Sequence, residues 1–150
     1  MMSCSFSSPL DASISNLRFL SELYLDYNSN LSSTIPTSLM NLTSLTVLSL
    51  SYCGFHGDFS SNVFLQPNLK CIDIGENSLL SDHLPEFPQV NTLLQYLNVG
   101  GMKFHGKLPS SVGNLKFLEG LFLSSCNFTG AIPFSIANLS HLAQFGSFSE

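Results

Sequence analysis

The chain has 150 residues and a formal net charge of −5, and only 10% of its residues are charged, against about 25% in an ordinary soluble domain. It has no run of basic residues, which argues against nucleic acid as a partner. It has no membrane segment of roughly 20 apolar residues, and residues 1–10 show neither the charged start nor the apolar core of a secretion signal.

One phrase, L-x-x-L-x-L-x-x-N/C-x-L/F, recurs along the chain, with copies at 20–28, 45–55, 69–79, 94–104 and 118–128. The alternation of apolar residues within each copy predicts a short strand. The position that holds Asn or Cys, called the ladder position below, is expected to point into a turn, where Asn can hydrogen-bond to neighbouring coils. It is occupied by Cys4, Asn28, Cys53, Asn77, Met102 and Cys126, at intervals of 24, 25, 24, 25 and 24 residues.

Two shorter phrases follow each predicted strand. The first follows a turn and reads L-x-G-x-I-P or a variant of it, at 31–36, 104–109 and 128–133. The second has the apolar spacing of a short helical or 3-10 turn, at 38–42, 111–115 and 135–139. A period near 24 residues with this wording is the signature of a leucine-rich-repeat solenoid. The sequence therefore predicts an α/β solenoid of about six coils, with parallel strands on the concave face and short 3-10 or helical turns on the convex face. Residues 1–150 are expected to form a single repeat array, uncapped at both ends.

The outward-pointing strand residues are the candidate binding surface, because the concave faces of solenoids are their usual binding faces. Tyr24, Tyr52, Tyr96 and Phe122 are the first candidates for anchors, and four acids make one half of the face negative, which favours a basic peptide or protein. The alternative is that these are solvated strand residues. The full set of candidates is Glu22, Tyr24, Asp26, Tyr27, Tyr52, Asp73, Glu76, Tyr96, Asn98 and Phe122.

The spacing of the cysteines argues against disulfide bonds. Stacked strands lie roughly 4.8 Å apart, so cysteines at ladder positions two or three coils apart exceed the Cα separation of about 7 Å that a disulfide tolerates. Cys71 immediately precedes Ile72, on the open face, and is a candidate exposed thiol. Four free cysteines are expected; the alternative is an intermolecular bond through Cys71.

No catalytic or metal-binding arrangement stands out from the repeat. His56 and His105 occupy equivalent Phe-His-Gly positions two coils apart, without a cysteine or carboxylate at zinc-ligand spacing. Neither a phosphate-binding glycine motif nor a Ser/His/Asp arrangement is present. We therefore expect no enzyme activity, no metal and no cofactor.

Four Asn-x-Ser/Thr sequons, at Asn30, Asn41, Asn127 and Asn138, are candidate glycosylation sites and favour an extracellular chain. The alternative is that these asparagines serve the convex turns of the repeat.

The segments 48–59, 84–88, 106–115 and 123–133 carry a family resemblance. The residue pattern of these segments resembles the plant-specific leucine-rich repeat and, more closely, the ectodomains of plant receptor-like proteins, including those similar to wilt-resistance receptors. The resemblance implies a cell-surface receptor without its own kinase, at the extracellular face of the plasma membrane. Such a receptor would recognise a peptide or protein ligand in defence or growth signalling and act with a co-receptor kinase.

The chain departs from that family pattern because it shows no signal peptide, no capping segments and no membrane anchor. We expect it to be a piece of a longer array. Two other functions remain open: a secreted inhibitor of a cell-wall-degrading enzyme, similar to polygalacturonase inhibitors, and a non-functional truncated copy.

Overall fold

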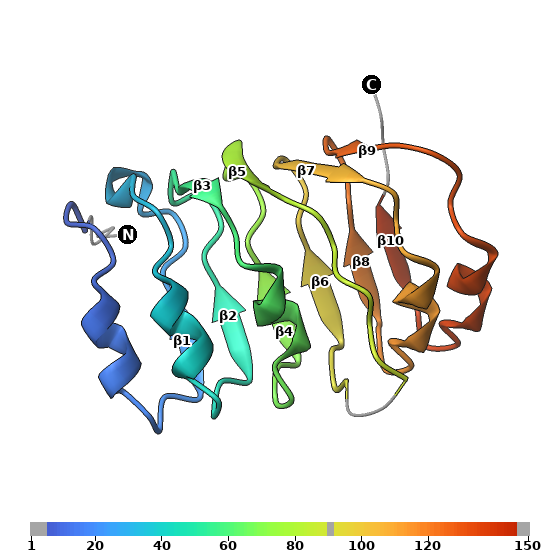
Figure 1. Cartoon of the computed structure of the whole chain (residues 1–150), viewed down its shortest axis with the longest axis horizontal. Coiled ribbons are helices and arrows are strands. Elements are labelled where there is room, and N and C mark those ends of the chain that lie inside the picture. The colour runs from blue at the N-terminus through green and yellow to red at the C-terminus, as the bar shows by residue number, and fades with distance from the viewer. Residues whose placement is uncertain (1–5, 90–91, 147–150) are drawn as a thin grey trace.

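Six short parallel strands form one sheet in which each strand pairs with the strand of the next coil (Figure 1). The computed structural model describes residues 6–89 and 92–146. The sheet runs in chain order through β1 (Glu22–Tyr24), β2 (Val47–Ser49), β4 (Cys71–Asp73), β6 (Tyr96–Asn98), β8 (Gly120–Phe122) and β10 (Gln144–Gly146). Every strand is displaced from the previous one by a single coil, so the predicted solenoid is confirmed.

Short 3-10 turns lie on the opposite side of each coil from the strands, in front of the sheet in Figure 1. Three of them begin directly after Pro36, Pro109 and Pro133, whose φ angles of −67°, −65° and −66° suit an extended residue at the start of the turn. The predicted convex turns are confirmed. The convex set is η1 (Ala12–Asn16), η3 (Thr37–Asn41), η4 (Ser61–Leu65), η5 (Ser110–Asn114) and η6 (Phe134–Asn138). A further 3-10 turn, η2 (Ser29–Leu31), directly follows the ladder residue Asn28 and lies at the upper edge of the molecule in Figure 1.

A second parallel sheet follows one edge of the solenoid, and the sequence reading did not predict it. It consists of β3 (His56–Asp58), β5 (Leu79–Asp82), β7 (Lys103–Gly106) and β9 (Asn127–Phe128). These strands overlap the start of the L-x-G-x-I-P phrase, for which the sequence predicted no strand. The physical reason is that a strand of two to four residues is stabilised only by the neighbouring coil, so its own apolar pattern is too short to reveal it.

The core is the stack of apolar strand residues from successive coils. Leu48, Ile72, Leu97 and Leu121 align in register, and each is 0% exposed. In the first coil Leu23 is only partly buried, because it has one fewer neighbouring coil within the described residues. Each coil thus buries its apolar stripe against its neighbours, as expected of a solenoid.

The ladder position makes the expected hydrogen bonds between coils. The Asn77 side chain is 0% exposed and donates to the carbonyl oxygens of Leu50, Ile74 and Gly75 at 2.9, 2.8 and 3.2 Å, while its oxygen accepts from the backbone N–H groups of Cys53 and Phe55 at 3.2 and 3.1 Å.

The cysteines at the ladder position also donate a hydrogen bond to a backbone carbonyl of the preceding coil. The Cys53 thiol donates to the carbonyl of Leu25 at 2.9 Å, and the Cys126 thiol donates to that of Val99 at 3.0 Å. Met102 is buried at the same position, and Cys4 lies outside the described residues.

Cys53, Cys71 and Cys126 are free thiols in the structure. Burial raises the pKa of the Cys71 thiol to about 11, and the charges of Asp73 and Asp26 act in the same direction. Cys71 is half-buried rather than fully exposed, because Val47 and Tyr96 flank it on the adjacent strands.

Candidate ligand-binding face

The face of the six-stranded sheet that points away from the 3-10 turns is called the open face. Strand register arranges its side chains in straight rows across the coils. The first row is Glu22, Val47, Cys71, Tyr96 and Gly120, and the second is Tyr24, Ser49, Asp73, Asn98 and Phe122. The ten binding candidates lie on or directly beyond these strands, so the predicted in-and-out alternation places them on one surface.

A third row follows the strands, at the point where each coil turns. Its members are Tyr27, Tyr52, Glu76, Gly101 and Ser125, with φ angles of 61°, 54°, 57°, 71° and 55°. The first four donate their backbone N–H to the next coil, to the carbonyls of Ser51, Gly75, Gly100 and Ser124 at 2.9, 3.2, 2.7 and 2.8 Å. The left-handed backbone is therefore built into the repeat, although it is uncommon for residues other than glycine. We call this row the turn row.

Two tyrosines of the turn row stack on each other in solvent. The ring centroids of Tyr27 and Tyr52 are 4.9 Å apart, with 8° between the ring planes. The two side chains remain 73% and 46% exposed. Because the spacing of the rings matches the roughly 4.8 Å distance between strands, the stack follows from the repeat itself and provides a preformed aromatic surface.

The half-buried acids of the face each use one oxygen to hold the coil. One Asp26 oxygen accepts from the Ser49 and Ser51 hydroxyls, both at 2.8 Å, and from the Ser51 N–H at 2.9 Å. One Asp73 oxygen accepts from the Asn98 amide at 3.0 Å and from the Gly75 N–H at 3.2 Å.

The second oxygen of each carboxylate makes no hydrogen bond within the described residues. Burial raises the pKa of the Asp73 carboxyl, and the charge of Asp26 adds to this effect. The face therefore holds closely spaced negative charge that the described residues do not neutralise.

The second aromatic pair is less available than the sequence suggested. Tyr96 and Phe122 pack against each other, with ring centroids 5.3 Å apart, and both are half-buried. The Tyr96 ring lies so close over Gly120 that a Cβ atom there would come within 2.8 Å of it. These aromatic residues form a packed wall of the face, whereas Tyr24 and Tyr52 are exposed.

The glycines do not leave the middle of the face empty. A Cβ at Gly75 would meet the Asn98 amide at 2.8 Å, and a Cβ at Gly101 would meet the Glu76 carboxylate at 2.8 Å. Two candidate ligand-binding side chains therefore lie over the glycines of neighbouring coils. The sequence does not show this arrangement, because it depends on which way each side chain leans.

The candidates divide into two groups by exposure. Asp26, Asp73, Tyr96, Asn98 and Phe122 are half-buried and packed or hydrogen-bonded within the face. The exposed group, Glu22, Tyr24, Tyr27, Tyr52 and Glu76, lies on the first three described coils of the sheet.

The four sequon asparagines are all exposed and lie outside the open face. Asn41 and Asn138 end their 3-10 turns, at the position that Asn114 occupies in η5. The Asn114 side chain donates to the carbonyl of Phe87 at 2.9 Å, whereas those of Asn41 and Asn138 make no hydrogen bond within the described residues. At these two positions the observed hydrogen bonds do not support a purely structural role. Glycosylation of all four remains a prediction.

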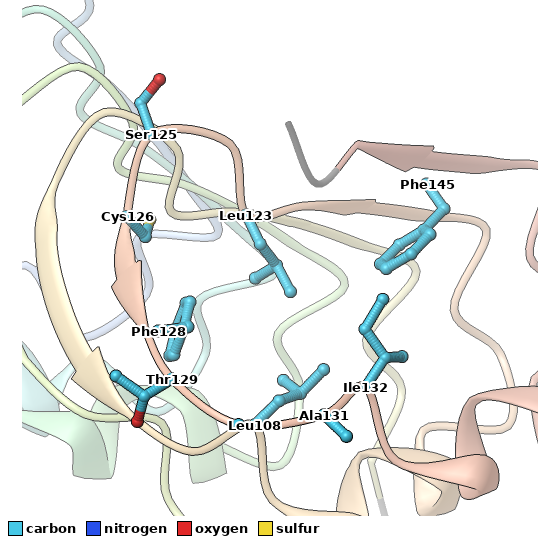
Figure 2. Close-up of a pocket in the computed structure, with 10 residues that line it drawn as sticks. Leu108, Leu123, Ser125, Cys126, Phe128, Thr129, Ala131, Ile132 and Phe145 are labelled. Atoms are coloured by element: carbon cyan, nitrogen blue, oxygen red, sulfur yellow. The ribbon is translucent and has the colours of Figure 1, made fainter. Parts of the chain in front are cut away.

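A small hollow, which the sequence did not predict, lies at the C-terminal end of the described coils (Figure 2). Leu108, Leu123, Phe128 and Ile132 surround it, and Phe145 closes one side.

The described part of the chain contains no helix with the length and apolar character needed to cross a membrane.

Comparison with known proteins agrees with this architecture. The Leucine Rich Repeat family model matches residues 117–139. Receptor-like protein 39 of Arabidopsis thaliana is 36% identical over 131 residues, which cover 85% of this chain and 14% of the relative.

Two solved structures of receptors have the same fold. The plant peptide hormone receptor RGFR1, in complex with RGF2, superposes with a TM-score of 0.83 and 29% identity over 93% of this chain and 22% of the receptor. The Arabidopsis receptor kinase HAESA, in complex with the peptide hormone IDA and the co-receptor SERK1, superposes with a TM-score of 0.78 and 26% identity over 93% of this chain and 24% of that one.

The fold, the repeat phrase and the family model together define a leucine-rich-repeat solenoid. Within that class, the chain belongs with the plant receptor-like proteins. It spans about one seventh of the length of the relative described above.

Proposed function

We propose that the open face recognises a basic peptide, or a basic segment of a protein, as part of a plant receptor-like protein. The observation that carries the proposal is the combination of exposed tyrosines and unpaired acids on the first three described coils. Tyrosine offers a large contact area with a polar end, and unpaired carboxylates favour cationic partners by charge complementarity. HAESA was solved with the peptide hormone IDA, and RGFR1, a peptide hormone receptor, was solved with RGF2; both support a peptide as the ligand.

The charge distribution of the molecule supports a basic partner. The only contact within salt-bridge distance between a basic and an acidic side chain in the described residues joins His83 and Asp82, 2.8 Å apart. Neither belongs to the open face, and no Lys or Arg of the described chain neutralises Glu22 or Glu76. A cationic ligand would therefore supply charge that the described residues do not.

Selection from a displayed library of random 12-residue peptides tests this proposal. We expect the enriched peptides to carry net positive charge. A variant combining Glu22→Gln, Tyr24→Ala and Glu76→Gln should bind them at least tenfold more weakly, as measured by biolayer interferometry. Phe134→Ala is the matched control, because this fully exposed aromatic side chain lies on a 3-10 turn. Peptides that bind the open-face variant and the parent equally would refute the proposal.

The cellular setting is a second part of the proposal. We infer that the full-length protein lies at the extracellular face of the plasma membrane and acts in defence or growth signalling with a co-receptor kinase. The HAESA complex, which contains the co-receptor SERK1, supports this arrangement. Expression of the tagged full-length protein in plant cells tests it: staining of intact cells and co-purification of a receptor kinase are expected, and a purely intracellular signal would contradict it.

A further inference from the structure

The ring of Tyr52 stacks on Tyr27 with one face, and its other face points towards the coil that carries Glu76. Tyr27, Tyr52 and Glu76 are consecutive members of the turn row. Because the two rings are nearly parallel and stack along the row, one face of the Tyr52 ring covers Tyr27 and the other is directed towards the coil of Glu76. Tyr52 remains 46% exposed, so this second face is not fully covered.

The Glu76 carboxylate lies beyond its own coil. The carboxylate carbon would be 2.8 Å from a Cβ atom at Gly101, the next member of the turn row. The side chain thus leans away from Tyr52, over a residue that has no side chain. It remains within electrostatic range, because the charge of Glu76 is the largest cause of the raised pKa of the Tyr52 phenol.

The second face of Tyr52 and the Glu76 carboxylate would lie on either side of a flat group stacked on the ring. Coils of a parallel sheet repeat about every 4.8 Å. A group stacked on the second face of Tyr52 would therefore lie at the level of the Glu76 coil, with the carboxylate on its far side. Within the described residues the Glu76 carboxylate accepts no hydrogen bond and has no ion-pair partner.

The backbone at these positions follows the repeat, because all five members of the turn row have positive φ angles. Tyr52 and Glu76 have φ angles of 54° and 57°, a conformation that glycine adopts at no steric cost and that Tyr and Glu adopt only with strain. Gly101 shows that the repeat accepts glycine here.

Resting on the proposed function, we propose that Tyr52 and Glu76 form a subsite for an arginine side chain of the bound peptide. The guanidinium plane stacks on the second face of Tyr52, and its positive charge lies between that ring and the Glu76 carboxylate. Arginine is selected over lysine because its planar guanidinium stacks on an aromatic ring, whereas the lysine ammonium is a compact point charge.

Nuclear magnetic resonance titration of the ¹⁵N-labelled chain tests the subsite without knowledge of the natural ligand. The probes are N-acetyl-arginine amide, N-acetyl-lysine amide and the uncharged isostere N-acetyl-citrulline amide. We expect the arginine probe to shift the backbone signals of Tyr52, Glu76 and Gly101. It should saturate at a concentration at least threefold lower than the lysine probe, and the citrulline probe should cause no saturable shift.

Two substitutions separate the roles of the ring and the carboxylate. Glu76→Gln should abolish the preference for arginine over citrulline. Tyr52→Asn should abolish the preference for arginine over lysine, and asparagine is chosen because it tolerates the left-handed backbone. Phe134→Ala, away from the open face, is the control and should leave all three titrations unchanged. If Tyr52→Asn fails to give a folded spectrum, Glu76→Gln alone decides.

Equal binding of the arginine and lysine probes would overturn the inference, as would the absence of shifts at the subsite or shifts centred elsewhere. The outcome is separable from the proposed function. Library peptides that bind the open face without an arginine preference would overturn the subsite alone. An arginine-selective subsite on a face that binds no library peptide would overturn the proposed function alone.

Discussion

Replacing Asn77 by alanine is expected to be among the most damaging substitutions of a polar residue in this chain. The side chain is 0% exposed and makes five hydrogen bonds, three to the preceding coil and two within its own. Alanine would leave the backbone N–H groups of Cys53 and Phe55 without an acceptor. A buried donor without a partner costs about 1–3 kcal/mol, so the two together cost roughly 2–6 kcal/mol.

Urea denaturation followed by circular dichroism measures this loss. We expect the free energy of unfolding to fall by about 3 kcal/mol or more. That is a large fraction of the 5–15 kcal/mol typical of a folded domain. The midpoint should fall without a change in the m-value, since the surface exposed on unfolding is unchanged. At about 2–4 °C per kcal/mol for a chain of this size, the melting temperature should drop by roughly 6–12 °C.

Asn68→Ala is the matched control, because this exposed asparagine donates a single hydrogen bond, 2.8 Å long, to the carbonyl of Thr43. It should cost less than about 1 kcal/mol. Asn77→Cys should fall between the two, since a thiol can donate as Cys53 does but is a weak acceptor. If Asn77→Ala destabilised the chain no more than Asn68→Ala, the hydrogen bonds of Asn77 would not contribute the expected ~3 kcal/mol or more to the free energy of unfolding.

Three further predictions concern packing, thiol reactivity and local opening. Leu50→Ala should cost about 2–5 kcal/mol by leaving a core cavity, whereas Tyr52→Ala should leave the fold intact; equal thermal effects would show that the register is wrong. Because the pKa of Cys71 is raised to about 11 from an ordinary value of 9.0, its thiolate is scarce at pH 8. Alkylation there should be about a hundredfold slower than in the denatured chain, and equal rates would contradict the burial. Met102 holds the ladder position of the next coil and offers no amide group, so its coil should be looser. The N–H of Asn77 therefore lacks the kind of acceptor that Asn77 provides for Cys53, and it should exchange with deuterium at least tenfold faster than the N–H of Cys53. Equal protection of these two amides would show that Met102 does not loosen its coil.

Much of the open face was predictable because a strand has a side-chain period of two. Once Leu23 and Leu25 are assigned to the core, Glu22 and Tyr24 must point the other way. A period of 24–25 residues then aligns these positions between coils. All ten binding candidates lie on or beside this surface for that reason, although their binding role remains a prediction.

The availability of each side chain was not predictable in the same way. Tyr52 and Tyr96 are both tyrosines on the same face, yet one is exposed and stacked while the other is half-buried against Phe122. The difference depends on whether the neighbouring coil offers a glycine for the ring to cover. Such choices are made by rotamers and contacts between coils, about which the period carries no information.

The sequence by itself determined the solenoid, the register of its coils and the direction of each strand residue, because all three follow from apolar spacing that recurs within single coils. Only the tertiary structure decided the second sheet, the stacking of Tyr27 on Tyr52 and the placement of the Glu76 carboxylate over Gly101. Each of these depends on a contact between residues 22 to 25 positions apart, which forms only when one coil lies against the next.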